Sequence, residues 1–101
     1  MIVRAWRGWA RTDDADTYAE HYQTVVLPKL HAVPGFQSAQ LLRRTEGDET
    51  EFLSLAVFDD LDAIRAFAGP NYETAVLAAE ARAVMTHYDD HVHHYEVAAA
   101  G

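Results

Sequence analysis

Histidines and aspartates gather near the end of the chain, where their types suit metal binding or proton transfer. The group consists of His87, Asp89, Asp90, His91, His93 and His94. On an extended strand His91 and His93 share one face, because side chains two residues apart point the same way. Such a pair can contribute to a zinc, iron or copper site when further ligands come from elsewhere. No other His or carboxylate has the spacing to complete a set unambiguously, so we assign no metal ligands, and a metal-dependent site built on His91 and His93 stays an alternative.

The same imidazoles suit general acid or base chemistry, since histidine titrates near neutral pH. We expect His93 or His91 to take that role, with Tyr95 bordering a ligand on the same face. The alternative is an exposed strand end on which polar rings pack. His94 points to the opposite face, and the sequence does not determine which face looks toward the helices.

Aromatic and cationic side chains near the start of the chain could bind a flat ligand. We expect Trp6 to form a pocket wall and Arg4, on the same strand face, to bind a phenolate or carboxylate. The alternative is a packed Trp6 beside an Arg4 that pairs with an acidic helix. Tyr18 and Tyr22 lie on one side of the first predicted helix, and Tyr22 is either a catalytic phenol or a core aromatic with a hydrogen-bonded hydroxyl.

Two phenylalanines complete the set of candidate binding residues. Phe58 ends a strongly apolar strand and Phe67 lies on the short helix that follows it. Both have the character of core residues, and at most they line an apolar pocket.

Composition restricts the class of protein. A chain of 101 residues forms one domain, residues 1–101, and its net charge of −8 argues against nucleic acids and anionic membranes as partners. There is no cysteine, no apolar run of membrane-spanning length, and no phosphate- or dinucleotide-binding glycine motif. We expect a cytoplasmic protein, and its Ala- and Arg-rich composition suggests a GC-rich bacterial genome.

The order of predicted elements is β-α-β-β-α-β. Strands are expected at 2–10, 37–44, 51–58 and 91–97, with helices at 16–30, 63–68 and 72–85 and a loop at 87–90. Pro28 should kink or end the first helix near Leu27. This order is that of the ferredoxin-like α+β fold, with a four-stranded antiparallel sheet whose first and third strands are central.

The third predicted strand, 51–58, is nearly apolar throughout, which is typical of a strand covered on both faces. In this fold the helices cover only one face of the sheet. We therefore expect the sheet faces of two copies to meet in a homodimer with a large interface.

Several short motifs carry a resemblance to a known family over essentially the whole chain. They are Trp6-Arg7-Gly8, Val33-Pro34-Gly35-Phe36, Arg43-Arg44-Thr45-Glu46-Gly47-Asp48, Ala63-Ile64-Arg65-Ala66-Phe67-Ala68-Gly69, Tyr72-Glu73-x-Ala75-Val76 and His94-Tyr95-Glu96-Val97. The chain resembles the antibiotic-biosynthesis-monooxygenase-like group of the dimeric α+β barrel superfamily.

The resemblance implies a homodimer with a ligand pocket between sheet and helices. Haem-degrading members carry an Asn, a Trp and a His at three positions that here hold about Gly8, Phe58 and Leu77, so haem degradation is not expected. The resemblance implies instead a cofactor-independent monooxygenase of a small aromatic or polyketide-like substrate. The alternative is a non-catalytic dimeric protein that binds a small hydrophobic molecule or acts in stress response.

Overall fold

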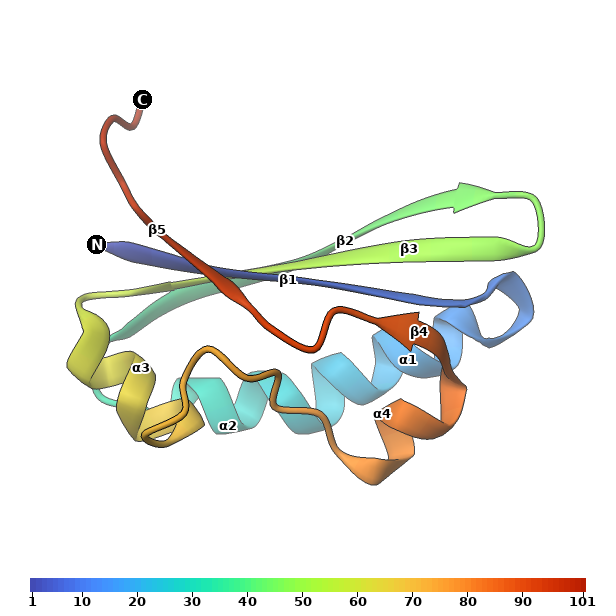
Figure 1. The fold of residues 1–101 in the computed structure, drawn as a ribbon, viewed down its shortest axis with the longest axis horizontal. Helices are drawn as coiled ribbons and strands as arrows, with labels where there is room; N and C mark the ends of the chain where they lie inside the picture. Colours follow the sequence, from blue (N-terminus) through green and yellow to red (C-terminus); the bar gives the residue numbers. More distant parts are fainter.

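The chain folds into one antiparallel sheet with all of its helices on one face (Figure 1). A computed structural model describes residues 1–101. The strands are β1 (Ile2–Arg11), β2 (Phe36–Glu46), β3 (Glu49–Phe58), β4 (Met85–Tyr88) and β5 (His93–Glu96), and they lie in the order β2-β3-β1 with β4 and β5 both paired to β1. The α+β class, the ferredoxin-like order and the central place of the first and third strands are confirmed.

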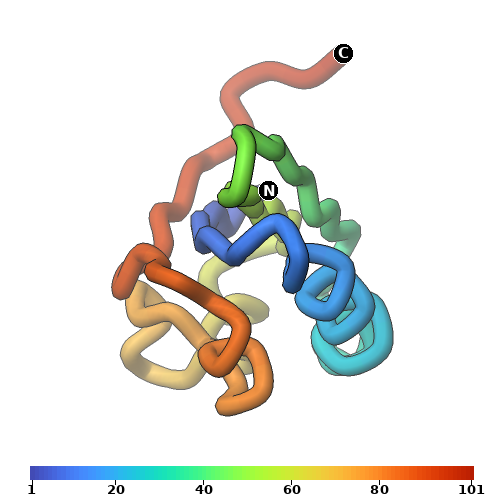
Figure 2. Tube along the Cα trace, turned by 90° about the vertical axis from the view of Figure 1, so that its right-hand side faces the viewer, coloured from blue at the N-terminus to red at the C-terminus, as the bar shows by residue number.

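One long helical run covers the β2–β3 side of the sheet. It consists of a 3₁₀ turn (Thr12–Asp14), α1 (Ala15–His21), a π-helical turn (Tyr22–Val26) and α2 (Leu27–His31). Figure 2 shows this run, blue to cyan, beside α3 (Leu61–Ala68) and α4 (Ala79–Val84), yellow to orange, under the arch of the strands. The helices therefore form two groups under the same face of the sheet.

The first helix does not end at Pro28, one of the two outcomes that we predicted, but its regular α-helical winding is interrupted just before the proline. The N–H of Leu27 bonds to the carbonyl of Tyr22, five residues back, and α2 continues to His31. In a regular α-helix the proline ring would clash with the carbonyl of Thr24, four residues before it. The wider π turn accommodates the ring, so the run changes its winding and continues.

The predicted helix over 72–85 is mostly wrong. Only Ala79–Val84 is helical, and the preceding segment instead lies along the segment that leads into β5. Backbone N–H groups of Ala75 and Val92 donate to the carbonyls of Asp90 and Glu73 at 2.9 and 2.8 Å. These tertiary hydrogen bonds replace the i to i+4 bonds that helix propensity alone would favour.

The prediction of one last strand at 91–97 is also wrong, because two short strands, β4 and β5, pair with the same edge of β1. Tyr88 pairs with Gly8 in β4, and His94 pairs with Arg4 in β5. The sheet therefore has five strands rather than four. Between β4 and β5 the chain loops away, and there the N–H of Asp89 bonds to the carbonyl of Arg7 at 3.0 Å.

The two faces of the sheet differ sharply in burial. Phe52, Ala56 and Phe58 of β3 face the helices and are buried. The alternate residues Leu53, Leu55 and Val57 face away from the helices and are only half-buried. The strand therefore has an apolar second face that the single chain does not cover.

The helix-facing core consists of two clusters. Trp6, Tyr18 and Phe52 belong to the first, and Leu30 and Phe58 to the second. No helix of the chain is both long enough and apolar enough to cross a lipid bilayer.

Candidate functional site

An apolar cavity of about 100 Å³ lies between the sheet and the helices. It touches both core clusters, with Trp6 and Tyr18 from one and Leu30 and Ala56 from the other. Of its 17 lining residues, 13 are hydrophobic and none is an Asp or Glu. The cavity therefore suits a small apolar or aromatic ligand, and any charge that it offers is positive.

Arg4 brings that charge into the cavity wall from β1. Its side chain is only 6% exposed, yet it forms no ion pair within the chain. The guanidinium donates to the carbonyls of Tyr72 and Thr74, the latter at 3.3 Å, and to Nε2 of His94 at 3.2 Å. A buried cation held by neutral acceptors is a strong attractor for a ligand anion.

The donor inventory of Arg4 leaves two N–H groups free. A guanidinium has five donors, and three are used, two on Nη1 and one on Nη2. The free groups are the Nε–H and the second N–H of Nη2. Because no fully buried side-chain nitrogen lacks a partner, the unpartnered Nε lies in contact with open space. Burial lowers the pKa of Arg4 to about 10, so it stays charged at neutral pH.

The two predicted tyrosines come together on the cavity wall opposite β1. Tyr18 and Tyr22 are 3% and 5% exposed, and the hydroxyl of Tyr22 lies 3.4 Å from that of Ser54. Burial raises the pKa of Tyr18 above its usual range, and Tyr22 nearby adds to the effect. Burial also raises the pKa of Tyr22, against the smaller opposing effect of the Ser54 hydrogen bond. Both phenols are protonated at neutral pH, so they can donate hydrogen bonds to a ligand.

Trp6 lines the cavity from β1, and two contacts fix the position of its ring. Its indole N–H donates to the carbonyl of Asp89 at 2.8 Å. Gly8, two residues along, makes room for the ring, since a Cβ at Gly8 would lie 2.5 Å from Cη2 of Trp6. Gly8 stands where haem-degrading relatives were expected to carry Asn, and the position of Trp6 leaves no space for that side chain.

Gly8→Ala is therefore expected to destabilise the fold. The added methyl group must displace Trp6 or the backbone, which costs about 1–3 kcal/mol in a packed interior. Urea denaturation measures this as a lower transition midpoint. Gly101→Ala, where the added Cβ meets nothing within 4 Å, is the matched control and should leave the midpoint unchanged. An equal midpoint for Gly8→Ala would show that Trp6 is not held in this position.

The structure separates the predicted site residues into two groups. Arg4, Trp6, Tyr18, Tyr22 and Phe67 all line the cavity. Their roles in binding or catalysis stay predictions.

The remaining predicted site residues lie elsewhere. Phe58 is fully buried in the second core cluster, with its ring 5.7 Å from that of Phe36. His93 and Tyr95 are exposed on the face of the sheet that points away from the helices, and His91 is exposed before β5. The register pairs Arg4 with His94, so His94 rather than His93 lies on the helix side.

Several cavity residues were not predicted as site residues; for His21 the sequence suggested only a half-exposed place at the border of the first helix. His21, half-buried on α1, is the one histidine that lines the cavity, and Val76, Leu77 and Val92 reach it from the segments beside β5. The spacing of Tyr18, His21 and Val25 on one helix side was a readable signal for His21. The sequence carries no signal that residues 76–78 line the cavity, because we expected a helix there and the structure has an extended segment. No group of three or more His, Asp or Glu side chains is arranged to hold a metal ion.

The comparisons with known proteins agree on the fold. SnoaB, a cofactor-independent oxygenase from Streptomyces nogalater, is 17% identical with a TM-score of 0.69, over 98% of this chain and 95% of that one. The heme-degrader MhuD from Mycobacterium tuberculosis is 20% identical with a TM-score of 0.64, over 100% and 99%. The monooxygenase ActVA-Orf6 of Streptomyces coelicolor, solved with nanaomycin D, is 21% identical with a TM-score of 0.54, over 69% and 62%.

No curated protein sequence matches the chain. At these identities the solved structures show a shared fold, and the family rests on a separate match. The family model described as antibiotic biosynthesis monooxygenase matches residues 1–76, from β1 to Val76, one of the residues that line the cavity. The chain therefore belongs to the antibiotic biosynthesis monooxygenase family.

Proposed function

We propose that the protein is a cofactor-independent monooxygenase of a small aromatic compound whose acidic hydroxyl binds as an anion beside Arg4. The observation that carries this proposal is the buried guanidinium, which faces an apolar cavity and has no carboxylate partner. Family membership and the likeness to a cofactor-independent oxygenase support the reaction class.

The cavity supplies the conditions that such a reaction needs. An electron-rich aromatic anion can react with O₂ directly, without a metal or a flavin. Arg4 favours the anion, the hydroxyls of Tyr18 and Tyr22 can donate to it, and Trp6 offers a flat surface. The apolar lining keeps water away from the reactive carbon.

In the proposed reaction O₂ from solution is the oxidant. The ligand hydroxyl gives its proton to His21 at the cavity wall, and the anion passes one electron to O₂. Superoxide and the ligand radical then combine at a ring carbon that bears hydrogen. The peroxide anion so formed takes the proton back from His21 and becomes a hydroperoxide. The hydroperoxide loses water, which includes the hydrogen of that carbon, to leave a new carbonyl, so one oxygen atom enters the product and the other leaves as water.

Of the predicted catalytic residues, only Tyr22 has a role in this proposal. Tyr22 acts as a hydrogen-bond donor, because its raised pKa keeps it protonated. His91 and His93 are exposed away from the cavity, so His21 takes the place of the base. Phe67 contributes to the apolar wall, while Phe58 and Tyr95 have no part in ligand contact.

Isotope incorporation tests the reaction. The protein is incubated with hydroxylated naphthalenes and naphthohydroquinones under ¹⁸O₂, with EDTA present and no cofactor added, and products are analysed by mass spectrometry. We expect one ¹⁸O atom per product and a loss of turnover in Arg4→Gln. Binding without turnover across the panel would favour the alternative of a non-catalytic binding protein, and incorporation that needs an added metal or flavin would overturn the proposal.

His21→Gln separates the base from the binding groups. The variant should bind naphthalene-2-sulfonate with unchanged affinity at pH 8, because this anion has no proton for a base to remove. Its turnover should fall by about 10² to 10⁴ fold, the usual contribution of a general base. Stopped-flow absorbance measures turnover, and His31→Gln, on the exposed end of α2, is the control. Unchanged turnover in His21→Gln would remove His21 from the mechanism.

We also propose that two copies associate through the open face of the sheet. Leu53, Leu55 and Val57 form an apolar strip there, beside Leu42, which is 43% exposed. Arg44 and Glu51, 3.4 Å apart, place both signs of charge on the same face. Such a surface can be complementary to itself about a two-fold axis. We propose a cytoplasmic location for this dimer, which its acidic composition supports.

Leu55→Asp is expected to separate the dimer. A charge in the middle of the apolar strip would be buried without a partner. Light scattering coupled to size exclusion should give the mass of two chains for the native protein at micromolar concentration and of one chain for the variant. Thr17→Asp adds the same charge on the exposed side of α1 and should stay dimeric. A native monomer would refute the dimer.

A further inference from the structure

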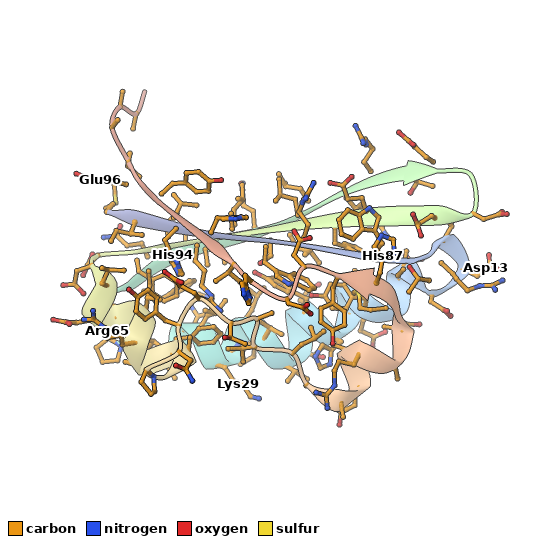
Figure 3. The ribbon with its side chains drawn as sticks, viewed as in Figure 1. Asp13, Lys29, Arg65, His87, His94 and Glu96 are labelled. Carbon is orange, nitrogen blue, oxygen red and sulfur yellow. The ribbon has the colours of Figure 1, made fainter.

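His94 is the one side chain that hydrogen-bonds to Arg4, and it does not line the cavity. Its Nε2 lies 3.2 Å from Nη1 of Arg4, and Figure 3 shows it on the helix side of the crossing of β5 and β1. A guanidinium can only donate hydrogen bonds. The Nε2 of His94 therefore accepts this bond, and its imidazole is neutral.

The surroundings of His94 contain charges of both signs. Burial and the Arg4 cation lower the pKa of His94, the carboxylate of Glu73 raises it, and His93 on the same strand lowers it slightly. The ring of Tyr72 meets the imidazole edge-on at 5.3 Å. On the far side of that ring lies the guanidinium of Arg65, 5.3 Å from the ring centre. Of these groups, only Arg4 also faces the cavity.

We propose that an anion bound beside Arg4 and a proton on His94 stabilise each other, so that the site takes up the ligand anion and the proton together. The inference rests on the proposed function, since it concerns the same anion. A bound anion offsets the positive field of Arg4 and draws its Nη1 toward the cavity. His94 then loses its hydrogen-bond donor and keeps the attraction of Glu73, and both changes favour the imidazolium.

The proton balance depends on the ligand. An acidic phenol releases one proton when it binds as the anion, and His94 takes one up, so that binding leaves the pH of the solution nearly unchanged. A permanent anion brings no proton, and the proton on His94 then comes from the buffer. This equilibrium is the same whichever group first removes the proton of a phenol.

Calorimetry with a permanent anion tests the linkage. Naphthalene-2-sulfonate is titrated into the native protein at pH 5.5 to 8.5, in buffers of different ionisation enthalpy. We expect net proton uptake on the acid side of the ordinary histidine pKa of about 6.5, and about three- to tenfold tighter binding at the acid end, as a shift of up to one pKa unit gives. Naphthalene-2-sulfonamide, neutral over this range, should show neither effect.

Three variants assign the proton. His94→Gln keeps an acceptor for Arg4 but cannot titrate, so its binding of the sulfonate should be independent of pH. His21→Gln removes the other imidazole near the cavity, and His93→Gln removes the neighbour on the opposite face; both should keep most of the native uptake. Proton uptake that persists in His94→Gln, or sulfonate binding without proton uptake in the native protein, would overturn the link between the anion and His94 but leave the anion site at Arg4 standing. Failure of the sulfonate to bind would overturn this inference and the anion site together.

Discussion

Arg4→Gln is expected to weaken the binding of naphthalene-2-sulfonate by about tenfold to a hundredfold. A hydrogen bond to a charged group contributes about 1.5–3 kcal/mol, and 1.4 kcal/mol is a factor of ten in affinity. In the apolar cavity no other buried cation can replace the guanidinium, because Lys29 is exposed at the rim. Fluorescence or calorimetric titration measures the loss.

The controls for Arg4→Gln separate charge from shape. The uncharged naphthalene-2-sulfonamide should bind both proteins almost equally. Arg7→Gln removes an arginine from the same strand but from its exposed side, so its affinity should equal that of the native protein. Equal losses for the two ligands in Arg4→Gln would mean that the cavity has collapsed, and an unchanged sulfonate affinity would refute the anion site.

Phe58→Ala is expected to destabilise the protein by about 3–5 kcal/mol. The ring of Phe58 is fully buried and packs between Phe36, at 5.7 Å, and Phe67, at 6.2 Å. A small domain has a total stability of about 5–15 kcal/mol, so this one truncation could remove most of it. Urea denaturation at 25 °C measures the change.

Phe58→Leu tests whether this ring also contacts a ligand. Leucine fills most of the space, so the fold should survive with a smaller loss of stability. Because Phe58 does not line the cavity, the affinity of Phe58→Leu for naphthalene-2-sulfonate should be unchanged. A weaker affinity at unchanged fold would return Phe58 to the ligand site that the sequence suggested for it.

The sequence predicted the fold where local pattern and tertiary contacts agree. The apolar run ending at Phe58 predicted β3, and the helix expected at 63–68 forms as α3, which begins two residues earlier. There the side chain of Asp60 accepts a hydrogen bond from the N–H of Ala63 at 3.0 Å. The pattern failed at 72–78. There the carbonyls of Tyr72 and Thr74 are held by Arg4, a contact across 68 and 70 residues that no local window contains.

The sequence predicted which types of residue form the candidate site, but not which face of the last strand points toward the helices. Arg4 and Trp6 share a face by their spacing, and the structure places both at the cavity. For the last strand, a shift of one residue exchanges the faces. The loop between β4 and β5 sets that register, so His94 rather than His93 meets Arg4, and a period of two alone could not have decided between them.

The π turn at Tyr22–Val26 links the number of residues in the first helical run to the shape of the cavity wall. Tyr22, Val25 and Val26 all belong to this turn, and all three line the cavity. A π turn holds one residue more than the α-helical winding around it. Deleting Gln23 would restore regular α-helical winding and rotate Tyr18 and Tyr22 relative to Val26, while the sheet keeps its place. In this chain a single-residue deletion is thus a route to a new ligand preference on an unchanged fold.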